Sequence, residues 1–298
     1  MAAPGSASSL AAAGQQIELS VIAPAHNEQD NVGALVEQVR AAVEPLGVPF
    51  EMIVVDDGST DATRARLMEL MAGGARPWLR CIAMTRTPKG KGAGQSAAFF
   101  AGFAEGRGRL VATLDADLQN DPADITAMVK LMRENGADMV QGDRSHARRD
   151  NVVRRVGSVV GRAFRRWLLG DTIRDTGCSL RVMKREIAVQ LPLQFRGMHR
   201  FIPVTARHMG YTVVEMRVNH RARVAGETKY GMGIVQRAIP GLIDLFAVRY
   251  MRSRRRATEH EEVGSGVKGP PEAAPGDAVA AVRVRRAEAM SGAAGVSR

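Results

Sequence analysis

The stretch Leu114-Asp115-Ala116-Asp117-Leu118-Gln119-Asn120-Asp121-Pro122 carries the strongest structural signal in this chain. It follows the apolar run 110–114, which predicts a buried strand. Alternate side chains of a strand point to the same side, so Asp115 and Asp117 bring two carboxylates together. Such charges repel unless one carries a proton or a cation lies between them, and oxygen ligands suit Mg²⁺ or Mn²⁺. A solvated turn is the alternative for an isolated Asp-x-Asp pair.

Two other apolar runs also end in acidic loops. One leads into Asp56-Asp57-Gly58-Ser59-Thr60-Asp61 and a predicted helix over 62–71. The other leads into Pro24-Ala25-His26-Asn27-Glu28 and a predicted helix whose apolar face is Val32, Leu35, Val36, Val39 and Val43. In open α/β sheets, ligands bind beyond the carboxyl ends of the strands. The three strand ends, which present Glu28, Asp56, Asp57, Asp115 and Asp117, therefore predict an α/β domain that binds a nucleotide and a metal.

These ordered motifs resemble those of the family-2 inverting glycosyltransferases with the GT-A fold, and most closely the polyprenyl-phosphate (dolichol-phosphate mannosyltransferase-like) branch. Further matching motifs are Gly94-Gln95-Ser96-Ala97-Ala98, Asp175-Thr176-Gly177-Cys178-Ser179-Leu180-Arg181, Gly197-Met198-His199-Arg200-Phe201 and the segment 220–231. The resemblance spans roughly residues 17 to 252 and departs from the family at His26, where a Tyr is common. It implies a mixed, mostly parallel central sheet flanked by helices.

The resemblance implies transfer of a sugar, with inversion, from a nucleotide sugar of the GDP-mannose or UDP-glucose type to a polyprenyl phosphate. It assigns the Mg²⁺ or Mn²⁺ site to Asp115, Asp117 and Gln119. The metal would act as a Lewis acid on the departing diphosphate. The expected contacts to the nucleotide sugar are Pro24, Ala25, Glu28, Asp56, Asp57, Lys91, Asp115, Ala116 and Asp117.

The acceptor side calls for cations. A lipid monophosphate is largely dianionic at neutral pH, because its second pKa is about 6, so it needs charge compensation more than a strong base. Arginine supplies this through paired hydrogen bonds. By resemblance, the residues that bind the acceptor phosphate are Arg144, Arg181, Arg223 and Lys229. Asp175 would orient Arg181 or act as a base, which makes the expected catalytic set Asp115, Asp117, Asp175 and Arg223.

The net charge of +11 also needs a partner. Valines and arginines alternate at helical spacing over 152–168, a pattern typical of a helix on an anionic membrane surface. A core helix with a solvated basic face is the alternative. The apolar segment 234–251 contains charges and a central Pro240-Gly241, so we expect it to lie in the interface rather than span the bilayer. We therefore expect a protein peripheral to the cytoplasmic face of the membrane.

Nucleic acid is a rival explanation of the charge. Proteins that bind single strands interleave basic residues with exposed aromatic side chains, whereas aromatics make up only 4% of this chain. We therefore expect no nucleic-acid partner. A second copy of the chain or a membrane protein stays open as a partner. Cys81 and Cys178 are too few for a disulfide framework and are expected to be reduced.

Three alternatives to the transferase stay open: a catalytically idle GT-A scaffold, a transferase with another membrane-associated acceptor, and a nucleotidyltransferase. The intact Asp115, Asp117 and Gln119 argue against the first. The third would need a glycine-rich Lys/Arg signature near the N-terminus, where this chain has the stretch 24–28. The expected organisation is a disordered N-terminus over 1–16, a GT-A domain over 17–232 with a nucleotide-sugar half (17–135) and an acceptor half (136–232), an amphipathic membrane-interface segment over 233–256, and a disordered tail over 257–298.

Overall fold

The computed structural model describes residues 16–88, 90–146, 152–221 and 234–256, and side chains in all of these except 152–160 and 234–239. Seven strands in this part of the chain form one sheet in the order β3-β2-β1-β4-β6-β5-β7. They are β1 (Leu19–Ala25), β2 (Phe50–Asp56), β3 (Leu79–Ala83), β4 (Leu110–Thr113), β5 (Met139–Asp143), β6 (Arg181–Lys184) and β7 (Val213–Arg217). All neighbouring pairs are parallel except those that β6 forms with β4 and β5. The expected mixed, mostly parallel sheet is confirmed.

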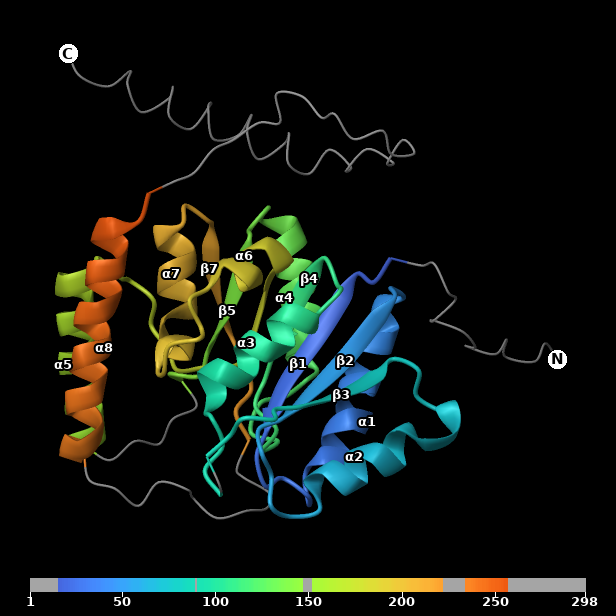
Figure 1. Cartoon of the computed structure of the whole chain (residues 1–298). Coiled ribbons are helices and arrows are strands. Elements are labelled where there is room, and N and C mark those ends of the chain that lie inside the picture. The colour runs from blue at the N-terminus through green and yellow to red at the C-terminus, as the bar shows by residue number, and fades with distance from the viewer. Residues whose placement is uncertain (1–15, 89, 147–151, 222–233, 257–298) are drawn as a thin grey trace, which may run out of the picture. The chain divides into compact units, whose positions relative to one another are not determined.

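Helices cover both faces of this sheet (Figure 1). The α-helices are α1 (Val32–Val43), α2 (Thr63–Met71), α3 (Gln95–Glu105), α4 (Asp124–Glu134), α5 (Val152–Leu169), α6 (Arg185–Gln190), α7 (Ile202–His208) and α8 (Ile234–Arg254), and short 3₁₀ turns are η1 (Glu44–Leu46), η2 (Ala72–Gly74) and η3 (Met198–Phe201). One apolar cluster joins α1, α2 and α4 to the sheet, and a second joins α3, α6 and α7 to the opposite face.

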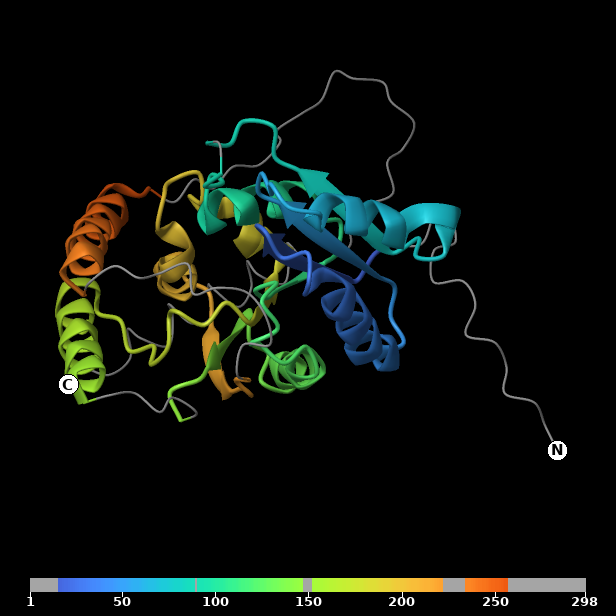
Figure 2. The same ribbon diagram turned by 90° about the horizontal axis from the view of Figure 1, so that it is seen from below.

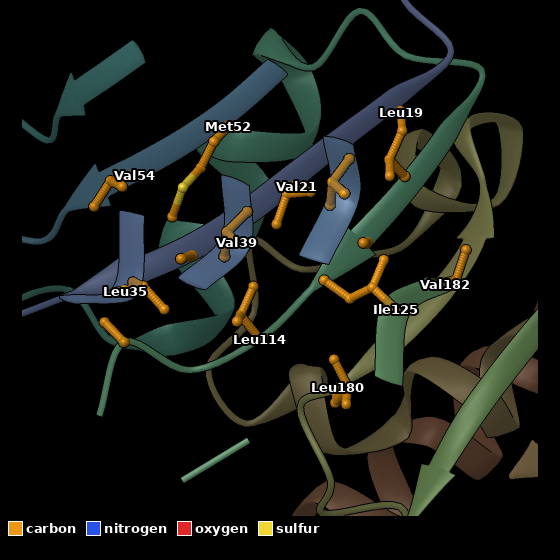
Figure 3. Packing of buried hydrophobic residues seen from close by; sticks show 14 of the residues in the cluster. Leu19, Val21, Leu35, Val39, Met52, Val54, Leu114, Ile125, Leu180 and Val182 are labelled. Atoms are coloured by element: carbon orange, nitrogen blue, oxygen red, sulfur yellow. The ribbon is translucent and has the colours of Figure 1, made fainter. Parts of the chain in front are cut away.

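Strand β1 shows why the central strands read as continuous apolar runs. Val21 and Ala23 belong to the cluster on the α1 face, whereas Ile22, which points the other way, packs in the cluster of α3. Because both faces are covered, all three side chains are fully buried. Leu35 and Val39 of α1 lie against β1 and β2, as Figure 3 shows. Truncating a fully buried leucine to alanine typically costs about 2–5 kcal/mol.

The apolar stripe predicted for the first helix is confirmed in full. The side chains of Val32, Leu35, Val36, Val39 and Val43 are all buried. On the opposite face of the sheet, α3 approaches β1 so closely that a Cβ at Gly102 would lie 2.4 Å from Cγ2 of Ile22. This close approach fixes the position of the first residues of α3, at the carboxyl end of β1.

Helices α5 and α8 lie side by side at the β7 end of the fold, beyond α7 (Figures 1 and 2). Arg249 of α8 donates a hydrogen bond of 2.8 Å to the carbonyl oxygen of Leu168 in α5. Helix α8 continues through Pro240, so the Pro-Gly pair does not end the helix. None of the helices in the described ranges is long and apolar enough to cross a membrane. The ends expected to be disordered, apart from Gln16, lie outside the described residues.

Candidate active site

The loops after β1 and β2 are bound to each other at one edge of the sheet. Ala25 pairs with Asp56 in the parallel register of these strands. Beyond them, Nδ1 of His26 lies 2.7 Å from the carbonyl oxygen of Asp57, and the amide of Asn27 donates to Oγ of Ser59 at 3.0 Å. The expected meeting of these polar strand ends is thus observed. Pro24 and Ala25 form the last two positions of β1, and Pro24 is partly exposed.

Glu28 and Asp56 are both held by groups of the protein. The carboxylate of Glu28 accepts a hydrogen bond of 2.7 Å from Asn31, and the Glu28 amide donates to Oγ1 of Thr63 at 2.8 Å. The side chain of Asp56 is fully buried, and Nε and Nη2 of Arg64 each lie 2.6 Å from its Oδ2. Its Oδ1 accepts the amide of Ser59 at 3.0 Å. Asp56, the last residue of β2, therefore also holds the loop that follows this strand.

Asp57 holds the glycine-rich loop that precedes α3. Its two carboxylate oxygens accept the backbone amides of Ala93 and Gly94, each at 2.7 Å. A Cβ at Gly92, whose φ is +64°, would lie 2.5 Å from Oδ2 of Asp57, so only glycine fits there. Lys91 is an exposed side chain in this loop. The loop is thus fixed over the strand ends by a carboxylate that the sequence assigns to nucleotide binding.

Asp115 and Asp117 lie just beyond β4, between the β1 end and the start of α3. Nε2 of Gln95 donates to Oδ1 of Asp115 at 2.5 Å, and the nearby side chain of Ser179 lowers the pKa of the same carboxylate. Burial and the neighbouring negative charge of Asp117 raise the pKa of Asp115 above its ordinary value. The amide of Gln119 donates to Oδ1 of Asp117 at 3.1 Å, which folds the motif into a tight turn.

Leu118 shows that this turn is strained. Its φ is +61°, a left-handed conformation that costs a non-glycine residue roughly 1–2 kcal/mol. The leucine side chain is only 4% exposed, and its burial offsets the strain. Ala116, on the other side of Asp117, is also buried. The two alternating apolar side chains anchor the turn so that both carboxylates are partly exposed at the site.

The donor groups at this turn fit a hard divalent cation. Mg²⁺ and Mn²⁺ prefer oxygen ligands, and Mg²⁺ is commonly held by one or two carboxylates together with substrate phosphates. Asp115 and Asp117 supply two carboxylates, and the pKa of Asp115 is raised first by burial and then by the negative charge of Asp117, which a cation would offset. No group of three or more His, Cys, Asp or Glu side chains suited to a metal occurs in the part of the chain that the structure describes.

Arg144 and Asp175 form a buried ion pair beside this turn. Nε of Arg144 lies 2.9 Å from Oδ2 of Asp175, and Nη2 lies 3.3 Å from Oδ1. Their side chains are only 12% and 5% exposed. The positive charge of Arg144 lowers the pKa of Asp115, although burial and Asp117 outweigh it. Asp175 therefore orients Arg144, an arrangement that the sequence did not predict.

Arg181 is buried more deeply than a phosphate ligand is expected to be. Its side chain is 2% exposed, Nη1 donates to the carbonyl oxygen of His199 at 3.1 Å, and Nη2 donates to that of Cys178. Burial lowers the pKa of Arg181 to about 10, so it stays charged at neutral pH. The expected phosphate contact stays a prediction, and the geometry favours a role in positioning the 175–181 segment.

The chain returns to the Asp115 turn just before residue 222. The amide of Arg221 donates to the carbonyl oxygen of Gln119 at 2.8 Å, and Nη2 of Arg221 lies 2.7 Å from Oδ1 of Asp121. Arg223 and Lys229 lie outside the described residues. The segment that carries them nevertheless starts at the edge of the carboxylate turn.

This arrangement of strand ends, glycine-rich loop and carboxylate turn agrees with the comparison to protein families. The model of glycosyl transferase family 2 matches residues 20–191, which is more than half of the chain. The chain belongs to glycosyl transferase family 2. The matched range includes β2, β4, all of β1 except Leu19, and every described residue of the site up to Arg181.

Curated relatives narrow the branch of this glycosyltransferase family. Dodecaprenyl-phosphate galacturonate synthase of Rhizobium johnstonii is 37% identical over 79% of this chain and 69% of its own length. Undecaprenyl-phosphate 4-deoxy-4-formamido-L-arabinose transferase of Yersinia enterocolitica is 34% identical over 72% of this chain and 63% of its own length. The chain thus spans about two thirds of the length of these relatives. Both are named as sugar transferases or synthases of a polyprenyl phosphate.

The solved structures confirm the GT-A-like fold. Glucosyl-3-phosphoglycerate synthase of Mycobacterium tuberculosis, crystallised with Mn²⁺, UDP and glucosyl-3-phosphoglycerate, superposes with a TM-score of 0.56. Each chain is covered to 80%, and the identity is 21%. At 21% identity, this similarity shows that the two proteins share a fold and nothing further.

Several residues of this glycosyltransferase site were not predicted from the sequence as members of the site. Gln95 and Ser179 contact Asp115, and Arg64 neutralises Asp56. Ser96 receives the amide of His199 at 3.1 Å, and burial with two nearby arginines lowers the pKa of that histidine to about 3. Gln95, Ser96 and Ser179 stand within motifs that resemble the family, which was a usable signal. Arg64 lies in α2, and no motif in the sequence indicated that it would contact Asp56.

Proposed function

We propose that this glycosyltransferase transfers a sugar from a nucleotide sugar to a polyprenyl phosphate, with a divalent cation and with inversion, at the cytoplasmic face of the membrane. The observation that carries the proposal is the Asp115–Asp117 turn, whose two carboxylates crowd each other at the edge where β1, β2 and β4 end. The two curated relatives, which are named for polyprenyl-phosphate products or acceptors, support the choice of acceptor.

Asp115 and Asp117 would hold Mg²⁺ or Mn²⁺, with Gln119 next to them. The bound metal would neutralise the negative charge that develops on the leaving diphosphate. The presence of Mn²⁺ in the structure of the mycobacterial synthase supports this choice. Gln95 would keep the carboxylate of Asp115 oriented through its hydrogen bond.

The nucleotide sugar would lie over the ends of β1 and β2. Pro24, Ala25 and Glu28 would line the base pocket, and Asp56 and Asp57 would face the nucleoside. Asp57 also fixes Ala93 and Gly94, so donor binding and loop geometry depend on one carboxylate. The exposed Lys91 in that loop would reach a phosphate of the donor.

The acceptor phosphate would enter from the side of Arg144. Asp175 fixes this arginine through two hydrogen bonds, which orients its guanidinium before a substrate arrives. A dianionic phosphate needs no strong base. Arg144 would instead compensate the charge of the acceptor phosphate and hold its attacking oxygen in position. Arg223 and Lys229 would complete this side, because the segment that carries them starts at Arg221 on the carboxylate turn.

Helices α5 and α8 would lie on the membrane surface. They carry five of the large apolar side chains that are exposed: Trp167, Leu242, Ile243, Phe246 and Tyr250. Exposed arginines, among them Arg162, Arg166, Arg254 and Arg255, stand on the same two helices or directly after α8. Apolar side chains next to cations are typical of helices that lie in the headgroup region of an anionic bilayer.

A transfer assay tests the proposed reaction. The purified chain is incubated with undecaprenyl phosphate and radiolabelled nucleotide sugars, in Mg²⁺, Mn²⁺ or EDTA. The donor panel holds GDP-mannose, UDP-glucose and nucleotide-activated galacturonate and formamido-arabinose. We expect one donor to give a labelled lipid that requires a metal. Hydrolysis of the donor with no lipid product would point to another acceptor, and no reaction with any donor would favour an idle scaffold.

Vesicle sedimentation tests the membrane placement. We expect the chain to sediment with anionic vesicles at low salt and to be released at 1 M salt, because the Debye length then falls from about 10 Å at 0.1 M to about 3 Å. Retention after the salt wash would indicate deep apolar insertion by α8. Failure to bind vesicles at any salt concentration would contradict the placement.

A further inference from the structure

A basic hollow of about 300 Å³ lies between the last turns of α5 and the segment that follows it. Its walls include Arg162, Arg165, Arg166, Asp171, Thr172 and Arg174. None of these residues belongs to the carboxylate turn or to the set expected to bind the acceptor phosphate. The hollow therefore needs an explanation of its own.

One arginine of the hollow is fixed in place. Arg165 forms an ion pair with the fully buried carboxylate of Asp171, and its own side chain is only 13% exposed. Nη1 of Arg165 donates to Oγ1 of Thr176 at 2.7 Å, and Nη2 donates to the carbonyl oxygen of Ile173 at 2.5 Å. The amide of Ile173 also donates to Oδ1 of Asp171 at 2.9 Å, so the one carboxylate of the hollow is paired with Arg165 and not with the other arginines.

Three further arginines stand around this base. Arg162, Arg166 and Arg174 are exposed, and within the described residues their guanidinium groups form no ion pair. The backbone amide of Arg174 donates to Glu215 at 2.7 Å, which fixes the point from which its side chain extends. Like charges gathered at one hollow repel each other, and a bound anion would relieve the repulsion.

We propose that this hollow binds a phosphate group, carried by the headgroup of an anionic phospholipid. Guanidinium groups hold phosphate oxygens through paired hydrogen bonds, and three exposed arginines line this hollow. Trp167 follows Arg166 in α5 and is 75% exposed, and tryptophan is typical of the headgroup level of a bilayer. The choice of a lipid source rests on the proposed membrane placement. A free phosphate has the same chemistry.

Trp167 provides a direct readout of the site. The chain has two tryptophans, so Trp78→Phe leaves Trp167 as the only one. We expect its fluorescence to change saturably with vesicles that contain phosphatidylglycerol, and to change less with pure phosphatidylcholine. Inorganic phosphate, as the soluble probe, should give a saturable change of its own and should compete with the anionic vesicles.

Matched arginine variants separate the hollow from general charge. Arg162→Gln with Arg166→Gln removes two charges from the hollow, and Arg254→Gln with Arg255→Gln removes two exposed charges at the end of α8. We expect the first pair to weaken binding of both probes about tenfold more than the second. Arg174→Gln should act in the same direction as the first pair, although it stands outside α5. Melting temperatures of all variants should stay close to that of the parent.

The outcomes decide both the site and its source. Equal losses for the two pairs, or a phosphate response that the hollow variants keep, would overturn the site. A phosphate response without any preference for anionic vesicles would assign the site to a soluble phosphate and overturn the lipid source. Sugar transfer to an acceptor dissolved in detergent tests the proposed reaction separately from the proposed phosphate site. If transfer fails while the hollow still binds phosphate, the reaction is wrong and the site stands.

Discussion

Two acidic pairs stand at neighbouring strand ends of this protein, and their surroundings differ. After β2, Asp56 meets the guanidinium of Arg64, and Asp57 accepts two backbone amides of the glycine-rich loop. After β4, Asp115 accepts a hydrogen bond from a neutral donor, the side-chain amide of Gln95. Burial and its acidic neighbour raise the pKa of Asp115.

Two acidic pairs that look alike in the sequence are therefore suited to two different tasks. A carboxylate whose charge is met by the chain itself can fix a loop, because its hydrogen bonds stay satisfied without a ligand. A carboxylate that is crowded by a second one at a partly open turn gains from a cation supplied from outside. In the proposed function, the first pair would shape the donor pocket and the second pair would hold the metal.

The largest effect is expected at the second pair. Asp117→Ala should lower the transfer rate by about a thousandfold or more, because loss of metal assistance removes several kcal/mol of stabilisation from the transition state. The measurement is the rate of labelled lipid formation in excess Mn²⁺. Glu134→Ala, at an exposed carboxylate of α4, is the control and should keep the parent rate. Comparable turnover by Asp117→Ala would remove the distinction between the two pairs.

Asp57→Asn should have a smaller effect, divided between stability and donor binding. The asparagine can accept only one of the two amide hydrogen bonds, and its NH₂ group would face the other donor. We expect a loss of about 1 kcal/mol in the free energy of unfolding, since a partly buried donor loses its hydrogen bond. The KM for the nucleotide sugar should rise more than kcat falls. A fall in kcat as large as that of Asp117→Ala would mean that both pairs act on the reaction itself.

Substitutions at two glycines distinguish the close contact with Asp57 from the effect of backbone strain. Gly92→Ala and Gly73→Ala both place a side chain at a positive φ, of +64° and +70°. Only the first brings a Cβ to within 2.5 Å of Asp57, since nothing lies within 4 Å at Gly73. Both should lose about 1 kcal/mol from strain, and Gly92→Ala should lose more and bind the donor more weakly. Equal melting temperatures and equal donor affinity would show that Asp57 does not need the close approach.

The smallest effect is expected in the pH dependence of Asp115. Its pKa is raised in the folded protein, so protonation of Asp115 favours the fold in acid, and this contribution is lost as the pH rises through the raised value. In EDTA, the melting temperature of Asp115→Asn should therefore gain on that of the parent as the pH rises above about 4, the ordinary pKa of an aspartate. The gain should be a few degrees at most, and excess Mn²⁺ should reduce it by stabilising only the parent. A gain that does not vary with pH would show that the carboxylate is not under electrostatic stress.

Most of the fold could be predicted from the sequence, because periodicity and strand ends are local signals. The hydrophobic pattern predicted the apolar stripe from Val32 to Val43 and the buried strands β1, β2 and β4. The family resemblance predicted that the sheet is mixed. The site was only partly predictable. Residues that act through hydrogen bonds, such as Gln95 and Arg64, lie 20 and 8 positions from the carboxylates that they contact. The buried placement of Arg181 also had no local signal.

The sequence by itself determined the family, the order of the elements and the candidate carboxylates, since each of these follows from short spacings along the chain. The tertiary structure decided which charged side chains come to lie next to each other. It placed Arg64 on Asp56, Asp175 on Arg144, and three arginines around one hollow beside α5. The physical reason is that charge compensation depends on distances between atoms a few ångströms apart in space. These distances are set by packing of the whole sheet rather than by the spacing of residues.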